Sequence, residues 1–145
     1  MEKLQFKTSI SAPKEKVWDI LWNGDNYNIW TSVFSAGSTA QTDWKEGSKV
    51  LFLDGNGKGM VSTIAANKPN EFMSFRHIGI VDNGVEDTES EMVKAWAGAM
   101  ENYTLKDVDG KTELTVDLDS NNEFKDYFTS TFPRALEKVK ELSED

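Results

Sequence analysis

The sequence contains one histidine and no cysteine, and this limits the chemistry that its side chains can perform. His77 can take up or release a proton near neutral pH, so it is the natural candidate for a general acid or base. It lies at the end of an expected strand that contains Phe75 and can project into the interior. The nearest candidate partners are Glu101 and Asn102, and no catalytic triad can be assembled. Because a lone histidine is more often structural, we assign no catalytic residue.

The same inventory disfavours other kinds of site. Without cysteine there is no thiolate nucleophile, zinc-thiolate site or disulfide, and no spacing of acidic residues matches a calcium-binding loop. We therefore expect no metal and no cofactor. Residues 55–59 are rich in glycine, but they lack the Gly-Lys-Ser/Thr ending of a phosphate-binding loop and lie between two expected strands. A hairpin turn is the better interpretation.

The composition and the net charge limit the kinds of partner that the protein can bind. The formal net charge of -9 and the isoelectric point near 4.6 disfavour nucleic acid and anionic membranes, which are bound by clustered Lys and Arg. No apolar run approaches the roughly 20 residues of a membrane-spanning helix, and the charged start lacks the apolar segment of a signal peptide. We expect a cytoplasmic protein. The 145 residues, with five Trp and eight Phe, suffice for one domain with a substantial core.

The hydrophobic pattern predicts a mixed α and β chain. Residues 4–10 alternate between apolar and polar types, which predicts a strand with one buried face. A helix is expected to begin near Pro13, because proline suits the first helical position, and a short helical turn follows around residues 27–30. Turn residues then separate the further strands that we expect, at residues 39–44, 48–54, 58–67, 71–80, 99–106 and 111–119.

The last third of the chain combines an acidic segment with a long helix. Residues 82–91 contain five acidic side chains and little to bury, which is typical of a solvated, mobile loop. A helix is expected at residues 122–142, and Pro133 should kink it because proline cannot donate to the carbonyl of Thr129. The apolar face of this helix comprises Phe124, Phe128, Phe132, Ala135, Val139 and Leu142.

Several short motifs accompany this order of elements. They are Ser-Ala-Pro-x-x-x-Val-Trp at residues 11–18, Trp30, Trp44-x-x-Gly47, Gly59-x-Val61, Pro69-Asn70-Glu71-Phe72, Asn102-Tyr103-Thr104-Leu105 and Gly110-Lys111-Thr112-Glu113-Leu114. With them the chain resembles the START-like helix-grip superfamily, also called birch-pollen-allergen-like, polyketide-cyclase-like or SRPBCC. Within it, the chain is most similar to the AHSA-like branch, named for activators of the heat-shock chaperone ATPase. The similarity spans nearly the whole chain, so we expect residues 1–145 to form one such domain.

The resemblance implies an α+β fold in which a curved antiparallel sheet of about six to seven strands wraps around the long C-terminal helix. Two short helices would follow the first strand. It also implies a cavity between sheet and helix, which in many relatives accepts a lipid, a polyketide, a hormone or another apolar ligand. Members of the superfamily include transport proteins, cyclases and co-chaperones. Fold alone does not decide between these functions.

Three functions therefore remain open. We favour a small-molecule binding or carrier protein for an apolar ligand. A co-chaperone-type interaction protein comes second, and a polyketide-cyclase-like enzyme comes third because few acid or base groups are available. A ligand is expected to enter beside Pro133, near the loop that carries Trp96. Large aromatic side chains can line a cavity or fill it. The residues that we expect to contact a ligand are Trp30, Phe34, Phe52, Phe75, His77, Trp96, Asn102, Phe128 and Phe132.

Overall fold

The computed structural model describes residues 1–145, and its strands form one antiparallel sheet. The strand order is β1-β8-β7-β5-β4-β3-β2, and β6 pairs with β5 beside this path. The α+β helix-grip prediction is confirmed, with one short strand more than expected. The elements are β1 (Glu2–Ile10), α1 (Lys14–Trp22), α2 (Gly24–Thr31), β2 (Thr39–Gln41), β3 (Lys49–Leu53), β4 (Lys58–Lys68), β5 (Phe72–Asp82), β6 (Val85–Asp87), α3 (Glu91–Lys94), β7 (Ala99–Val108), β8 (Lys111–Ser120) and α4 (Asn122–Glu144).

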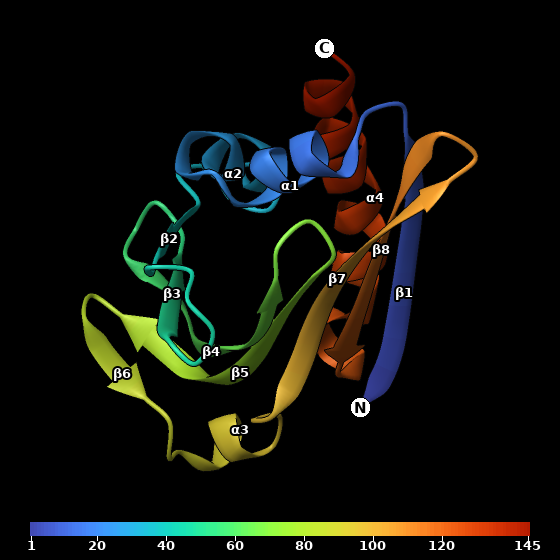
Figure 1. Ribbon diagram of the computed structural model, residues 1–145. Coiled ribbons are helices and arrows are strands. Elements are labelled where there is room, and N and C mark those ends of the chain that lie inside the picture. Colours follow the sequence, from blue (N-terminus) through green and yellow to red (C-terminus); the bar gives the residue numbers. More distant parts are fainter.

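The sheet curves strongly from β1 round to β2, and α1 and α2 lie across one end of the curve (Figure 1). Register shifts between Val61 and Ser62 and between Ile64 and Ala66 interrupt the pairing of β4 with β5. Such bulges bend a strand and increase its twist, so they account for much of the curvature. We call the face that meets the helices the inner face. It is the face on which the sheet can enclose a site.

Helix α4 runs alongside β1, with its C-terminal part next to α1 (Figure 1). The apolar face expected from the sequence divides into two parts. Phe132, Ala135 and Val139 are buried in the core, whereas Phe124 is 47% exposed and Phe128 is half-buried. The helix is continuous through Pro133. Its second half therefore anchors the fold, while its first half leaves aromatic rings at the surface.

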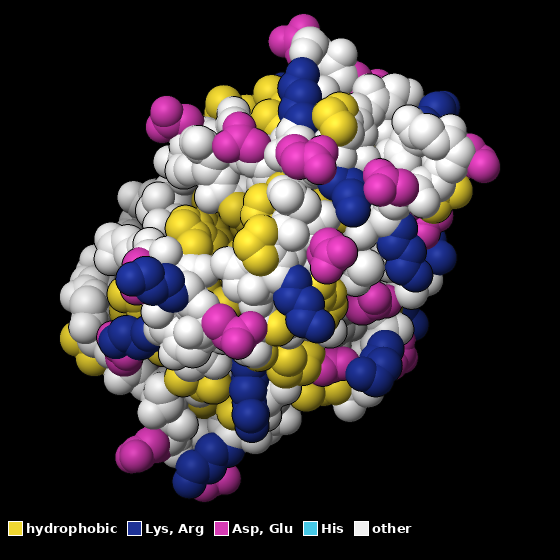
Figure 2. All heavy atoms as spheres, in the orientation of Figure 1, with side chains coloured by type: hydrophobic (Ala, Val, Ile, Leu, Met, Phe, Trp, Pro, Cys, Tyr) yellow, Lys and Arg dark blue, Asp and Glu magenta, His cyan; other side chains and the backbone are white.

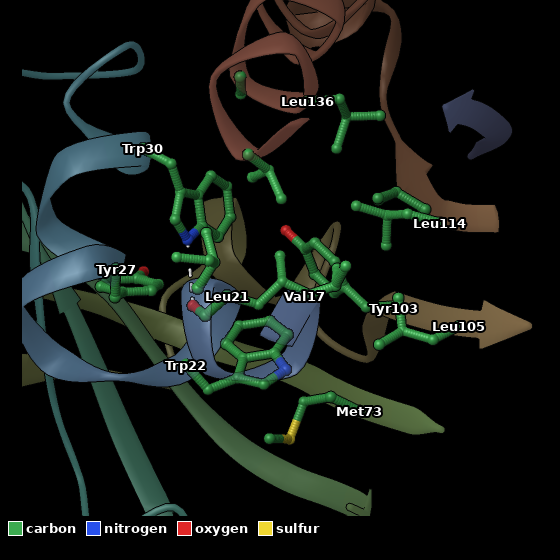
Figure 3. Close-up of a cluster of buried hydrophobic side chains, with 14 of the residues drawn as sticks. Val17, Leu21, Trp22, Tyr27, Trp30, Met73, Tyr103, Leu105, Leu114 and Leu136 are labelled. Atoms are coloured by element: carbon green, nitrogen blue, oxygen red, sulfur yellow. Dashed lines mark hydrogen bonds between the residues drawn. The ribbon is translucent and has the colours of Figure 1, made fainter. Parts of the chain in front are cut away.

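Aromatic side chains from helices and strands meet around Trp22, at the end of α1 (Figure 3). The ring of Trp22 lies 4.9 Å from that of Tyr103 and 5.4 Å from that of Phe75, measured between centroids. Trp30 on α2 donates its indole N–H to the carbonyl of Leu21 at 3.0 Å, which satisfies a buried polar group. This cluster joins α1 and α2 to the inner face of β5 and β7.

Two expectations about local structure were wrong. Residues 82–91 are mostly exposed to solvent, as expected, but they are not a loose loop, since β6 pairs with β5 there and the Asp87 carboxylate accepts from the backbone N–H groups of Glu89 and Ser90. The pairing of β6 with β5 ties the acidic segment to the sheet, and the bonds to Asp87 order the turn that follows. The strand expected at residues 39–44 ends at Gln41, because the backbone turns before Trp44, whose φ is 64°. The Trp44 ring thereby packs 5.6 Å from the ring of Trp22.

Charged side chains of both signs are interspersed on the face shown in Figure 2, with apolar groups visible between them. No histidine reaches the surface in this view, in agreement with the burial of His77. None of the helices combines the length and the hydropathy that crossing a bilayer requires.

Candidate functional site

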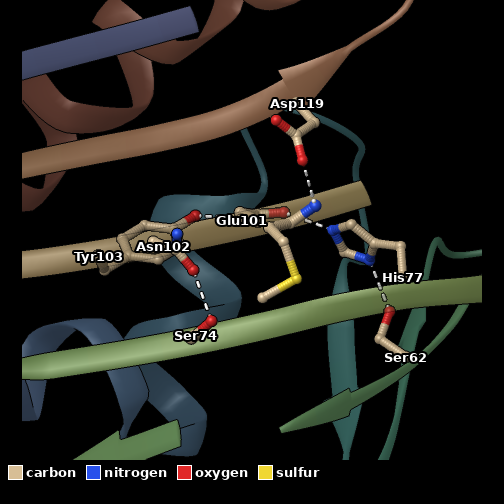
Figure 4. A network of polar contacts seen from close by, with 8 residues as sticks. Ser62, Ser74, His77, Glu101, Asn102, Tyr103 and Asp119 are labelled. Carbon is tan, nitrogen blue, oxygen red and sulfur yellow. Dashed lines mark hydrogen bonds and ion pairs between the residues drawn. The ribbon is translucent and has the colours of Figure 1, made fainter. Parts of the chain in front are cut away.

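A polar network lies on the inner face of β7 and β5 (Figure 4). Side chains alternate between the two faces of a strand, so Glu101 shares the face of Tyr103, which is buried against the helices. The Nε2 atom of His77 on β5 lies 3.0 Å from Oε1 of Glu101. The hydroxyl of Tyr103 donates to Oε2 of Glu101 at 2.5 Å. Two donors thus hold the two oxygens of one carboxylate.

The other ring nitrogen of His77 meets Ser62 on β4, with Nδ1 and Oγ 2.6 Å apart. Because a carboxylate can only accept, His77 must donate from Nε2, and both nitrogens of the ring are therefore engaged. The structure thus places a serine, a histidine and a glutamate in one hydrogen-bonded chain, which the sequence analysis did not foresee. Ser62 is fully buried, however, so its hydroxyl is out of reach of a substrate. These hydrogen bonds fix the positions of His77 and Glu101, but they do not make Ser62 a nucleophile.

The network keeps Glu101 ionised. Burial by itself would raise the pKa of Glu101, but the hydrogen bond and charge of His77 and the hydrogen bond from Tyr103 outweigh it and lower that pKa. The pKa of Tyr103 is raised by burial first and then by the charge of Glu101, so its hydroxyl stays a donor. The Glu101 side chain is 23% exposed. The inner face thus carries a negatively charged group on a side chain that is not fully buried.

Phe52 connects this network to the aromatic residues predicted to contact a ligand. Its ring centroid lies 5.0 Å from that of Phe75 and 6.0 Å from that of His77. Phe75 is buried, as is Trp30, so both belong to the core, whereas Phe52 is half-buried. Of these aromatic residues, Phe52 is therefore the one that can offer ring surface to a molecule next to Glu101.

The predicted residues on α4 form a second group. The ring of Phe132 lies 4.9 Å from that of Phe34 and 5.8 Å from that of Phe128. The hydroxyl of Tyr127 donates to the carbonyl of Phe34 at 3.0 Å, which fixes the segment after α2 against the first half of α4. Phe34 and Phe128 are half-buried and stand at the margin of the core.

Two predicted residues lie elsewhere. Asn102 alternates with Glu101 and Tyr103, so it faces the outer side of the sheet, where its amide oxygen accepts from Ser74. Trp96 follows α3, and its ring stacks on none of the other aromatic rings. Neither Asn102 nor Trp96 therefore contributes to the network around Glu101.

The surface also carries hollows away from Glu101. One of about 360 Å³ lies between β1 and α4, beside Pro133, and Trp96 is not among its lining residues. Another of about 610 Å³ is lined by residues 11–13 and by parts of the turn between β7 and β8. Few of the residues that line either hollow are hydrophobic.

Sequence reasoning missed three contributors to the site: Ser62, Tyr103 and Tyr27 on α2, whose ring lies 6.4 Å from that of Phe52. One signal for the location of the site was present. On β7 every second side chain faces the interior, and Glu101 belongs to this inward series together with Ala99, Tyr103 and Leu105. A carboxylate within such an apolar series indicates a paired or functional charge.

Comparison with known proteins identifies the family to which the chain belongs. The sequence profile of the family described as "Activator of Hsp90 ATPase homolog 1-like protein" matches residues 11–144. The chain belongs to this family. Membership of the Activator of Hsp90 ATPase homolog 1-like family supports a ligand-binding or co-chaperone-type role in general, with small molecules or proteins as partners. No curated protein matches the sequence.

Solved structures share the fold at low sequence identity. The solution structure of the Aha1 dimer from Colwellia psychrerythraea is 18% identical with a TM-score of 0.73, over 99% of this chain and 97% of that one. Protein MLL2253 from Mesorhizobium loti is 16% identical with a TM-score of 0.76, over 97% and 96%. CalU16 from Micromonospora echinospora is 13% identical with a TM-score of 0.66, over 95% and 71%. These likenesses establish the helix-grip architecture and nothing finer.

Proposed function

We propose that the protein binds a small, mainly apolar molecule on the inner face of the sheet, with Glu101 as its polar anchor. The observation that carries this proposal is the ionised carboxylate of Glu101, on a side chain that is 23% exposed, whose partner His77 lies 6.0 Å from the half-buried ring of Phe52, measured between ring centroids. A charge in apolar surroundings costs free energy unless other groups compensate it. His77 and Tyr103 compensate Glu101 and also fix its orientation, which suits a binding group.

The surroundings favour a ligand with a large apolar part. Small-molecule sites typically combine apolar and aromatic walls with a few placed polar groups. Phe52 supplies such a wall next to His77, the partner of Glu101, and Phe34 and Phe128 supply half-buried rings at the margin of the core. A bound apolar molecule would remove these partly exposed rings from water, at roughly 25 cal/mol for each Å² of apolar surface.

The alternatives differ in the surface that they use. A co-chaperone-type function would engage the exterior, where Val85 on β6 and Met92 on α3 expose apolar side chains. An enzyme of the polyketide-cyclase type would need an accessible acid or base, and on the inner face only Glu101 and the mostly buried His77 are available. Binding without turnover requires neither and is the function that the site supports best.

Amide-resolved NMR titration with flavonoids, sterols and fatty acids tests the proposal. We expect a binder to shift the backbone amides of Phe52, His77 and Glu101 together, and Glu101→Gln to weaken that binding. The matched control is Asp117→Asn on the outer face of β8, where Asp117 accepts only from Gln5. Shifts confined to the outer face or to Val85 and Met92 would contradict the proposal, as would silence with every compound.

A further inference from the structure

Strand β1 is the end strand of the sheet and has a strand neighbour on one side only (Figure 1). Its nine residues pair with β8 without a register shift, so they form a long and regular edge. Alternate residues of a strand direct their backbone N–H and C=O groups toward opposite edges, so about half of these groups on β1 point away from β8. Such an edge is a template for pairing with another chain.

Helix α4 contacts the two ends of β1 through charged side chains and leaves its middle open. Lys140 donates to the carbonyl of Ser9 at 2.8 Å, and Lys125 forms an ion pair with Glu2 at 2.8 Å. Between these two contacts lies the hollow of about 360 Å³ that separates β1 from α4. The residues that line this hollow are Gln5, Phe6, Lys7, Thr8, Pro133, Leu136 and Glu137.

The inward side chains of β1 are incompletely covered beside this hollow. Leu4 and Phe6 are half-buried. Their partners on β8, Leu118 and Val116, are buried, and β8 has a strand on each side. A further strand next to β1 would cover Leu4 and Phe6 in the same way and remove apolar surface from water. One of its own inward side chains would enter the hollow.

The outward side chains of β1 indicate the charge that such a strand should carry. Lys3 forms an ion pair with Asp119 on β8. Lys7 lies opposite Thr115 and forms no ion pair, although the chain has a net charge of -9. Opposite charges at cross-strand positions stabilise a sheet. Because Glu137 lines the hollow from α4, the negative charges of the added strand belong on its outward positions, next to Lys7.

A second copy of the chain fits this edge less well. If two copies of β1 pair antiparallel about Gln5, Lys3 of each copy lies opposite Lys7 of the other. A shift of the register by two residues makes these lysines diagonal neighbours. Like charges at such positions destabilise the pairing of strands.

We propose that the free edge of β1 binds an extended segment of another protein by strand addition. The segment alternates apolar with acidic residues. Its backbone pairs with β1, its apolar side chains cover Leu4 and Phe6, and a carboxylate faces Lys7. One apolar side chain occupies the hollow beside Pro133. This surface is separate from the site at Glu101, so the inference goes beyond the proposed function.

Three synthetic peptides of about seven residues, a usual length for a strand, test the inference by NMR at low salt. In the first, valine alternates with glutamate; in the second, lysine replaces glutamate; the third is the first with N-methylated backbone amides. The glutamate peptide should slow hydrogen exchange at those amides of β1 that do not bond to β8. It should bind at least about threefold more tightly than the lysine peptide, since an exposed ion pair contributes modestly. N-methylation removes the backbone donors and should abolish binding.

Charge reversal locates the preference on β1. Lys7→Glu should invert the preference between the glutamate and lysine peptides, whereas the matched control Lys68→Glu on β4 should preserve it. Both lysines are exposed and form no ion pair, so both variants should fold. Equal binding of the N-methylated peptide, binding without protection of β1, or silence with every peptide would overturn strand addition. Equal binding of the two charged peptides would overturn the acidic segment. Concentration-dependent dimerisation that protects the same amides without peptide would assign the edge to a second copy and contradict the proposal.

Discussion

Ser62 Oγ and His77 Nδ1 lie 2.6 Å apart in a part of the sheet where Ser62 is fully buried. The contact gives the histidine ring a fixed orientation, with its other nitrogen directed at Glu101. A Ser-His-Glu order resembles that of hydrolytic enzymes, but a hydrolase needs its hydroxyl within reach of a substrate. In this protein the buried serine instead orients His77 toward Glu101.

Ser62→Ala should therefore lower the unfolding free energy without changing any catalytic rate. Removal of the hydroxyl leaves Nδ1 of His77 buried without a partner, which typically costs about 1–3 kcal/mol of unfolding free energy. Urea denaturation measures that loss. Any hydrolysis of generic esters should persist within about tenfold in Ser62→Ala and in His77→Ala, less than a positioned acid or base usually contributes. An esterase rate abolished by either variant would overturn this reading.

Tyr27 and Tyr103 should respond differently to loss of the hydroxyl. Tyr103→Phe removes a donor to the Glu101 carboxylate and should lower the unfolding free energy by about 1–3 kcal/mol. The hydroxyl of Tyr27 makes no hydrogen bond within the protein and is not among its fully buried unpaired atoms, so Tyr27→Phe should leave the stability close to that of the parent protein. Parallel urea denaturation curves decide the comparison. Equal losses in the two variants would mean that the Tyr27 hydroxyl has a partner within the protein.

The lowered pKa of Glu101 makes a definite prediction about acid. A carboxyl group whose pKa is lower in the folded state than its ordinary value, here 4.5, stabilises the fold fully above that value. The contribution is lost as the pH falls through the folded-state pKa. Glu101→Gln should thus reduce the unfolding free energy at neutral pH, and the difference from the parent should shrink below about pH 4.5.

Other carboxyl groups titrate in the same range, so the difference between the two proteins is the quantity to measure. Hydrogen bonds from the backbone lower the pKa of Asp54 and of Asp87, and the side chain of Lys140 lowers that of Glu144. These groups are present in both proteins and cancel in the difference. A difference that stays constant from neutral pH to about pH 3 would show that Glu101 contributes no charge-dependent stability.

The sequence predicted the fold well because the fold depends on periodic patterns. Alternation in β1 and the apolar spacing on α4 are local signals, and each was found in its expected place. β6 was not predicted because it pairs with β5 through backbone groups, and such pairing requires no recognisable pattern in its acidic side chains. A backbone hydrogen bond places no demand on side-chain type in a short edge strand.

The site was harder to predict because it depends on register. His77 faces Ser62 only because the pairing of β4 with β5 shifts between Val61 and Ser62. A shift of one residue exchanges the side chains that face the interior, and no short sequence pattern fixes where it falls. Glu101 was named as a partner of His77, yet Asn102 was given equal standing. Side chains of a strand alternate between its two faces, so counting back from an inward-facing Tyr103 would have placed Glu101 on the inner face and Asn102 on the outer face.

The last prediction concerns the two halves of α4, which the sequence presented as one apolar face. Phe132 is buried against Phe6 and Phe34, with ring centroids 5.1 Å and 4.9 Å away. Phe132→Ala should therefore cost about 3–5 kcal/mol, the usual range for a buried phenylalanine. Phe128 is half-buried and contacts mainly rings of its own helix, those of Phe124, Tyr127 and Phe132.

Phe128→Ala should consequently cost less, on the order of 1–2 kcal/mol, since part of the ring surface remains exposed to water in the folded protein. Chemical denaturation of the two variants under the same conditions gives both values. The comparison also tests the proposed function, because Phe128 lies at the margin of the core, where a bound apolar ligand would bury more of its ring. A bound ligand should therefore raise the stability of the parent protein more than that of Phe128→Ala. Equal unfolding costs for the two substitutions would show that the first half of α4 is as firmly part of the core as the second, and would remove Phe128 from the ligand site.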